Sequence, residues 1–221
     1  MALRPSSPAW RPLLLLSLLL TTAPVHAGTS KPTVTDEMRK SMEDGWVVEY
    51  RDKTAGKGVA RWTAMGIVDD VPEAMLYVLL SFDKYKHFID RMKGSRITKT
   101  RGLTSYVVME TKLPWPVKDA WVYFKVTRKH LPGRIYELDF KMINGTMKQY
   151  LGWARVEPWG KDGKRSLLTY SLLFEPKTAV PAAAIDRGVW SITIHLVKRM
   201  RLRLKALRKF NKVPKAWGGP R

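Results

Sequence analysis

Side chains that could act as acids, bases or metal ligands are few in this sequence and lie far apart. The four histidines (His26, His87, His130 and His195) form no pair at metal-site spacing, and there is no HExxH motif or glycine-rich phosphate loop. His87 and Asp90 could share one face of a helix, but acid–base chemistry needs a desolvated site. The chain has no cysteine, which excludes thiolate chemistry and disulfides. The residues therefore predict no catalytic group, no metal site and no cofactor.

Apolar side chains that alternate with polar ones are the stronger signal. In one predicted strand Tyr136, Leu138 and Phe140 lie on one face, and Glu137 and Asp139 lie on the other. The same alternation recurs in other segments: Val107 and Met109; Val122, Phe124 and Val126; Leu168, Tyr170, Leu172 and Phe174. A sheet with one apolar face must bury that face. The pattern itself does not distinguish a solid core from a cavity that holds a ligand.

The order of predicted elements indicates one antiparallel sheet closed by a long terminal helix. Glycine-bearing turns separate short strands, which favours hairpin connections over a parallel sheet. The predicted helices cover 35–43, 71–82, 83–92 and 186–210, and the predicted strands cover 46–51, 59–68, 96–100, 105–112, 121–128, 134–143, 147–157 and 166–174. One face of the last helix carries the apolar residues Trp190, Leu196, Val197, Met200, Leu204 and Leu207.

The stretch Leu113–Asp119, which reads Leu-Pro-Trp-Pro-Val-Lys-Asp, lies between two of these strands. Its two prolines cannot lie in a central strand, so they predict a rigid connection. This arrangement resembles the START (steroidogenic acute regulatory protein-related lipid transfer) family and the wider SRPBCC, or helix-grip, superfamily. The resemblance spans roughly Gly45–Leu207. Many members carry Asp-Arg-Asp or Asp-Arg-Glu where this chain reads Asp119-Ala120-Trp121, so a role of that arginine does not transfer.

The resemblance implies an α+β helix-grip fold, in which a curved antiparallel sheet wraps around a long C-terminal helix and two short helices follow the second strand. It also implies a cavity for a lipid, sterol or other hydrophobic ligand, oriented by tyrosine hydroxyls. Carried over by position, the lining would be Phe124, Tyr136, Leu138, Phe140, Tyr170, Leu172, Trp190 and Met200. The small-residue segment Val180–Ala184 corresponds to a candidate gating loop.

The strong positive charge predicts an anionic partner. The formal net charge is +21, and the last helix carries a dense basic run: Lys198, Arg199, Arg201, Arg203, Lys205, Arg208 and Lys209. Basic amphipathic helices lie on anionic membranes, so we predict that these residues contact a membrane surface. A merely solvated face is the alternative. Nucleic acid is not expected as a partner, because the N-terminus predicts export.

The N-terminal residues read as a cleavable signal peptide. Arg4 and Arg11 precede a short leucine-rich run, and small residues follow it up to Ala27. We therefore divide the chain into a signal peptide (1–27), an N-terminal helical segment (28–44), a START-like lipid-binding domain (45–212) and a basic flexible tail (213–221). The expected location is the periplasm of a Gram-negative bacterium. Nothing in the sequence indicates an obligate assembly, so we expect a monomer.

These expectations together favour an exported START-like protein that binds one hydrophobic ligand, and could transfer it between membranes. Two alternatives stay open. One is a polyketide cyclase or dehydrase-like enzyme that uses the same cavity, as relatives in the superfamily do. The other is a non-catalytic basic protein with a solid interior that binds an acidic surface.

Overall fold

Eight strands form one antiparallel sheet. The structure is a computed structural model that describes residues 32–52, 60–113, 118–177 and 180–213. The strand order is β1-β2-β8-β7-β6-β5-β4-β3, so all neighbours except β2 and β8 are consecutive in the chain. The strands are β1 (Val48–Asp52), β2 (Arg61–Val68), β3 (Met92–Arg101), β4 (Thr104–Thr111), β5 (Ala120–Leu131), β6 (Ile135–Gly145), β7 (Met147–Trp159) and β8 (Arg165–Pro176).

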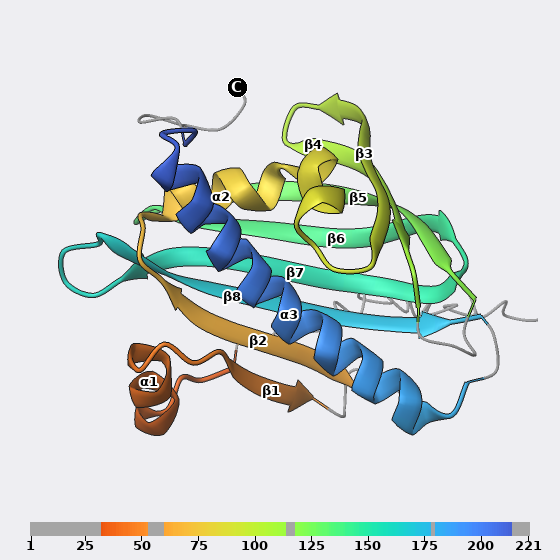
Figure 1. Cartoon of the computed structure of the whole chain (residues 1–221), viewed down its shortest axis with the longest axis horizontal. Coiled ribbons are helices and arrows are strands. Elements are labelled where there is room, and N and C mark those ends of the chain that lie inside the picture. The colour runs from red at the N-terminus through yellow and green to blue at the C-terminus, as the bar shows by residue number, and fades with distance from the viewer. Residues whose placement is uncertain (1–31, 53–59, 114–117, 178–179, 214–221) are drawn as a thin grey trace, which may run out of the picture.

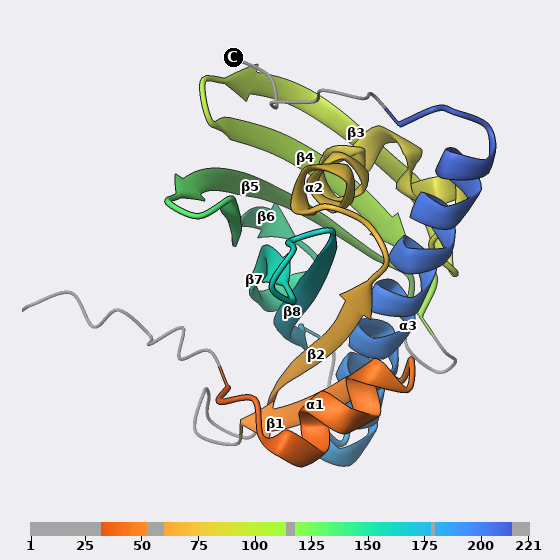
Figure 2. The ribbon, with the colours of Figure 1, turned by 90° about the vertical axis from the view of Figure 1, so that its left-hand side faces the viewer.

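Helices cover one face of this sheet. α3 (Ala182–Lys209) crosses it diagonally, and α2 (Pro72–Leu80) lies on the same face beside the 3₁₀ helix η1 (Phe82–His87). Figure 2 shows the sheet bent, with α2 and α3 on its inner side. α1 (Asp36–Glu43) lies apart, next to β1 and β2. The predicted helix-grip class, a curved antiparallel sheet with a long C-terminal helix, is therefore confirmed.

Local signals set several helix ends as the sequence predicted. The Thr35 hydroxyl accepts a hydrogen bond from the Met38 backbone N–H at 3.2 Å, which makes Thr35 the N-cap of α1. Pro72 is the first residue of α2, where its missing N–H costs nothing.

Two predictions about local structure were wrong. The predicted helix 83–92 is only the short η1, because Arg91 adopts a left-handed backbone (φ 62°) and β3 already begins at Met92. The candidate gating loop Val180–Ala184 is also partly helical, since α3 begins at Ala182 and not at Asp186. Alanine has the highest helix propensity, so this small-residue stretch extends the helix.

The main core lies between the inner face of the sheet and α2, η1 and α3. A second, smaller cluster lies on the outer face, where Met42 of α1 packs against Met65, Ile67 and Leu167. Glu43 fixes α1 there, because its carboxylate accepts hydrogen bonds from Trp159 Nε1 (2.7 Å) and Arg165 Nη1 (2.6 Å). Because α1 packs on the outer face, the elements that cover the inner face are α2, η1 and α3.

Candidate ligand-binding site in the interior

Three tyrosines place their hydroxyls inside the apolar core. They are Tyr85 of η1, Tyr150 of β7 and Tyr170 of β8. The Tyr85 hydroxyl donates to the backbone carbonyl of Leu79 at 2.7 Å. The Tyr150 and Tyr170 side chains hydrogen-bond to each other, and all three groups are close enough to interact electrostatically. The interior thus holds a small polar centre within apolar surroundings.

Burial keeps these hydroxyls protonated. It raises the pKa of Tyr85 and of Tyr170 well above the usual tyrosine value, and raises the pKa of Tyr150 to about 12. At neutral pH they are therefore hydrogen-bond donors and do not act as bases.

The pairing of β7 with β8 explains how two tyrosines meet. Tyr150 lies opposite Phe174, and Tyr170 lies opposite Ala154, so both face the inner side of the sheet, with the Gly152–Leu172 pair between them along the strands. Gly152 lies between them on that face. A Cβ atom at Gly152 would stand 2.6 Å from the Ser171 carbonyl oxygen and 3.0 Å from Phe140 Cδ2. Because glycine has no side chain, the Ser171 carbonyl and the Phe140 ring can lie closer to β7 at this position than another residue would allow.

Aromatic rings surround the polar centre. The Tyr150 ring lies 5.3 Å from Phe124, and the Tyr170 ring lies 5.5 Å from Phe140. Phe124 and Phe140 are themselves in edge-to-face contact at 6.2 Å. All of these side chains belong to the main core, in which Tyr150 is only partly buried.

The structure brings together six of the eight residues predicted to line a cavity. The residues buried in the main core are Phe124, Leu138, Phe140, Tyr170, Leu172 and Met200. Tyr136 is partly buried at one end of the same face. Trp190 lies outside the core: it is 37% exposed and its ring lies 6.4 Å from Trp62. We therefore leave Trp190 out of the proposed lining.

Sequence reasoning missed two of the three interior tyrosines. Tyr150 alternates with Gly152, Ala154 and Val156, so a period-two pattern through these residues could have found it. Tyr85 has no such signal, because its neighbours are lysines and it lies in a short 3₁₀ helix.

Glu73 in the first turn of α2 holds Tyr136 at the end of the inner face. Its Oε1 atom accepts hydrogen bonds from Arg134 Nε at 2.8 Å and from the Tyr136 hydroxyl at 3.0 Å. Arg134 is the main cause of a lowered pKa for the Glu73 carboxyl. Burial, and then Glu73, raise the pKa of Tyr136 to about 12. The Tyr136 hydroxyl is therefore already engaged by protein.

We expect Glu73→Gln to lower the free energy of unfolding at pH 7 by about 1–2 kcal/mol, since hydrogen bonds to a charged group are lost. Because the pKa of Glu73 is lowered in the folded state, its carboxylate stabilises the fold above the unfolded-state pKa of about 4.3, and this contribution is lost as the pH falls through the folded-state value. Urea unfolding at neutral and acidic pH should show the difference between wild type and Glu73→Gln shrinking on acidification. Glu49→Gln, an exposed change in β1, is the control; a pH-independent difference would contradict the prediction.

The dispersed acid–base candidates do not gather in the interior. Asp90 accepts two hydrogen bonds from Arg199, at 2.8 and 2.7 Å. His87, His130 and His195 are exposed; His130 stacks on Tyr136 at 4.7 Å, and His195 hydrogen-bonds the Ser191 carbonyl. Within the described residues, no three His, Cys, Asp or Glu side chains are close enough to hold a metal ion.

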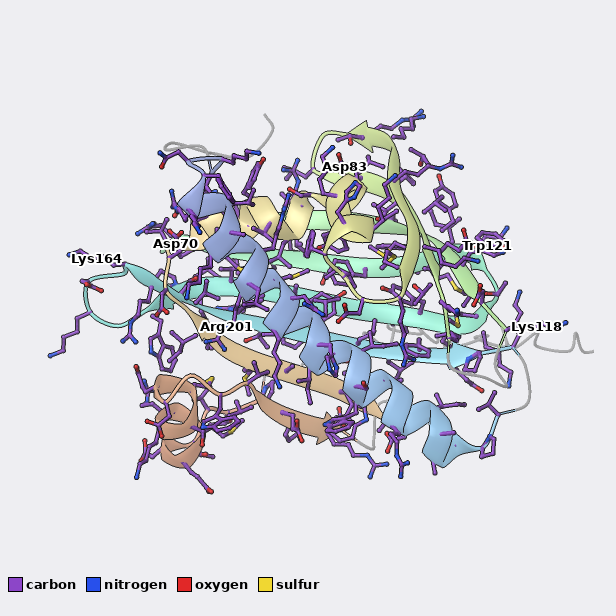
Figure 3. The ribbon with its side chains drawn as sticks, in the orientation of Figure 1. Asp70, Asp83, Lys118, Trp121, Lys164 and Arg201 are labelled. Carbon is purple, nitrogen blue, oxygen red and sulfur yellow. The ribbon has the colours of Figure 1, made fainter. Side chains whose placement is uncertain are left out.

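Six of the seven basic residues of α3 that were predicted to contact a membrane fall into two groups, and Arg203 belongs to neither. Arg199 and Arg208 pair with Asp90 and Asp70, residues 109 and 138 positions earlier, and Arg208 Nη2 lies 2.7 Å from Asp70 Oδ1. Figure 3 labels Asp70 beyond the end of β2 and Arg201 on α3; the Arg201 Nη1 donates to the Gly45 carbonyl at 3.1 Å. The hydrogen bonds of these three arginines hold α3 in its position across the sheet.

Exposed lysines form the other group. The exposed side of α3 carries Lys198, Leu202, Lys205 and Lys209 at successive helical turns, and Leu202 is 57% exposed. None of these three lysines makes an ion pair with the residues that the structure describes. The sequence predicted that all seven cations contact a membrane, but Arg199 and Arg208 pair with acids from distant parts of the chain.

No family model matches this chain, and no curated protein sequence matches it. Solved structures do resemble it. A STAR-related lipid transfer protein from Xanthomonas axonopodis superposes with a TM-score of 0.65 at 13% identity, covering 72% of this chain and 93% of that one. Human STARD10 gives 0.61 at 13% identity over 84% and 86%. Zhui aromatase/cyclase from a Streptomyces species gives 0.52 at 12% identity over 72% and 98%.

These likenesses define the fold. The chain has the START/SRPBCC helix-grip fold that its Pro-Trp-Pro segment suggested. That segment itself, residues 114–117, lies outside the described residues. No helix in the described part of the chain is long and apolar enough to cross a membrane.

Proposed function

We propose that this protein binds one hydrophobic ligand, such as a lipid or sterol, between the inner face of the sheet and α3. The observation that carries the proposal is the polar centre of Tyr150 and Tyr170 in apolar surroundings. Tyr150 keeps accessible surface although protein surrounds it closely enough to raise its pKa to about 12. We infer that this accessible surface faces a space inside the molecule, where a ligand can meet the Tyr150 hydroxyl.

The two hydroxyls also define the chemistry of the ligand. Each tyrosine has one O–H donor, so a hydrogen bond between Tyr150 and Tyr170 leaves one donor for another acceptor. An unpaired buried donor is costly, and a ligand oxygen would satisfy it. The burial that raises the pKa of both tyrosines also disfavours a negative charge beside them. The favoured ligand is therefore an apolar, uncharged molecule with one carbonyl or hydroxyl oxygen.

Binding is favoured over catalysis, although the likeness to an aromatase/cyclase keeps a cyclase-like reaction as the second candidate. A general base near neutral pH would need a histidine or carboxylate in the interior. The three histidines of the described residues are exposed, and Asp90 pairs with Arg199. Protonated tyrosines can bind and orient a ligand without reacting with it.

The rest of the proposal concerns location and partners. The protein is exported after cleavage behind Ala27, acts as a monomer, and does not bind nucleic acid. The exposed Lys198, Lys205 and Lys209 contact an anionic membrane, from which the ligand is taken or to which it is delivered. The lysine stripe with Leu202 in its middle supports this contact, because cations and an apolar side chain together suit a lipid interface. A surface that binds an acidic polymer would need the cations but not the exposed Leu202.

Native mass spectrometry of the protein purified from its exported compartment tests this function. We expect one bound small molecule per chain, and a polypeptide mass that corresponds to a chain beginning at Gly28. Tyr150→Phe or Tyr170→Phe should weaken binding of that ligand about tenfold, the effect of one lost buried hydrogen bond. Tyr123→Phe, on the outer face of β5, is the matched control and should bind as the wild type does. A chain that binds no ligand, or equal affinities in all three variants, would contradict the proposal.

A further inference from the structure

A small pocket opens between α2, η1 and the last turns of α3. Its volume is about 150 Å³, and Lys84 of η1, Arg203 of α3 and Lys212 after α3 all line it. Tyr77 and Ser81 also line it, and none of the lining residues is acidic. Since a water molecule occupies about 30 Å³ in the liquid, the pocket has room for a phosphate group.

The cations of this pocket differ from the other basic residues of α3. Asp90 and Asp70 neutralise Arg199 and Arg208. Arg203 instead lies over the Phe88 ring, 5.5 Å from its centre, and makes no ion pair with the described residues. Lys84 has one acidic neighbour, Asp83, which is exposed and lies outside the lining. Asp83 compensates the charge of Lys84 in part, whereas Arg203 and Lys212 make no ion pair with the described residues, so the pocket keeps an excess of positive charge.

Exposed apolar side chains lie at the same end of the molecule. Phe210, directly after α3, is 64% exposed, and Leu202 is 57% exposed. The ammonium groups of Lys209 and Lys212 lie 6.0 and 5.9 Å from the Phe210 ring. Exposed apolar side chains flanked by cations are typical of segments that enter the boundary between lipid headgroups and acyl chains. A soluble phosphate compound would not need them.

We propose that this pocket binds the phosphate of an anionic lipid headgroup at a membrane surface, while Phe210 and Leu202 enter the interface. Lys84, Arg203 and Lys212 supply the charge, and the Tyr77 and Ser81 side chains line the space that the phosphate oxygens would occupy. The site deepens the proposed membrane contact, on which it rests, and it involves none of the interior tyrosines. Its position places η1, α2 and the end of α3 against the membrane.

Vesicle sedimentation with the full mature protein tests the site. The triple variant Lys84→Gln, Arg203→Gln, Lys212→Gln is compared with Lys112→Gln, Lys118→Gln, Lys141→Gln, which removes the same charge from exposed positions elsewhere; Figure 3 shows Lys118 at the end of the molecule opposite Asp70. On phosphatidylcholine vesicles containing phosphatidylglycerol, the pocket variant should bind about a hundredfold more weakly, since each cation near the surface contributes about 1 kcal/mol. The control should change less than about threefold.

Equal losses in the two variants would mean that only net charge matters, and would overturn the site. Unchanged binding of the pocket variant would overturn it too, as would inorganic phosphate binding to a pocket that vesicles do not occupy. Thermal unfolding checks that both variants remain folded. Native mass spectrometry of the interior ligand separates this proposal from the proposed function: the pocket variant should keep its ligand, whereas Tyr150→Phe should keep its vesicle binding.

Discussion

Phe124→Ala is expected to lower the free energy of unfolding by about 3–5 kcal/mol, the usual cost of removing a buried phenylalanine. Phe124 is 1% exposed, and it contacts the rings of Phe82, Phe140 and Tyr150 at 6.2, 6.2 and 5.3 Å. It is the centre of the aromatic group beneath the proposed ligand. Urea unfolding, with an unchanged dependence on urea concentration, measures the loss.

Trp121→Ala in the same strand is the matched control for Phe124→Ala. Trp121 points to the outer face and is 41% exposed, so we expect its loss to cost about 1 kcal/mol or less. Similar losses for the two variants would mean that the inner face is not the core of the protein. Added ligand should restore part of the stability of Phe124→Ala if the ligand fills the neighbouring space.

Gly152→Ala is the second large effect, with an expected loss of about 3 kcal/mol, at the upper end for added volume in a packed site. The new Cβ would stand 2.6 Å from a backbone oxygen of β8, which cannot move without disturbing the sheet. It would also displace Phe140 and Leu172, whose side chains lie 3.0 and 3.3 Å from the same point. We therefore expect Gly152→Ala to lose ligand affinity as well, measured by titration of the ligand found in the purified protein.

Gly94→Ala provides the control, because it is the same substitution in another strand. The nearest side-chain atoms to a Cβ at Gly94 belong to Glu110 and lie 3.7 Å away, an ordinary contact distance. Its stability should stay within about 0.5 kcal/mol of the wild type. If the two alanine variants were equally stable, the close approach of β7 and β8 would not be the reason for the glycine.

Much of the fold follows from local patterns in the sequence. Alternation predicted the inner face of β5, β6 and β8, and glycine-bearing turns predicted the hairpins between them. Strand ends differ from the predictions by only a few residues, as in β5, which runs to Leu131 and not to Arg128. Such patterns are reliable because burying one face of a strand constrains every second residue of the same segment. The helix 83–92 was wrong because its apolar spacing did not reveal the left-handed backbone of Arg91.

The sequence by itself therefore determined the sheet, the long terminal helix and six side chains of the interior. Only the tertiary structure decided which polar groups meet. It brings Tyr85 and Tyr150 to Tyr170, joins Arg199 to Asp90 and Arg208 to Asp70, and leaves Arg203 beside Lys84 and Lys212 in one pocket. The physical reason is that periodicity reports the burial of one segment, whereas these contacts join segments that lie far apart in the chain and meet only when α3 packs across the sheet.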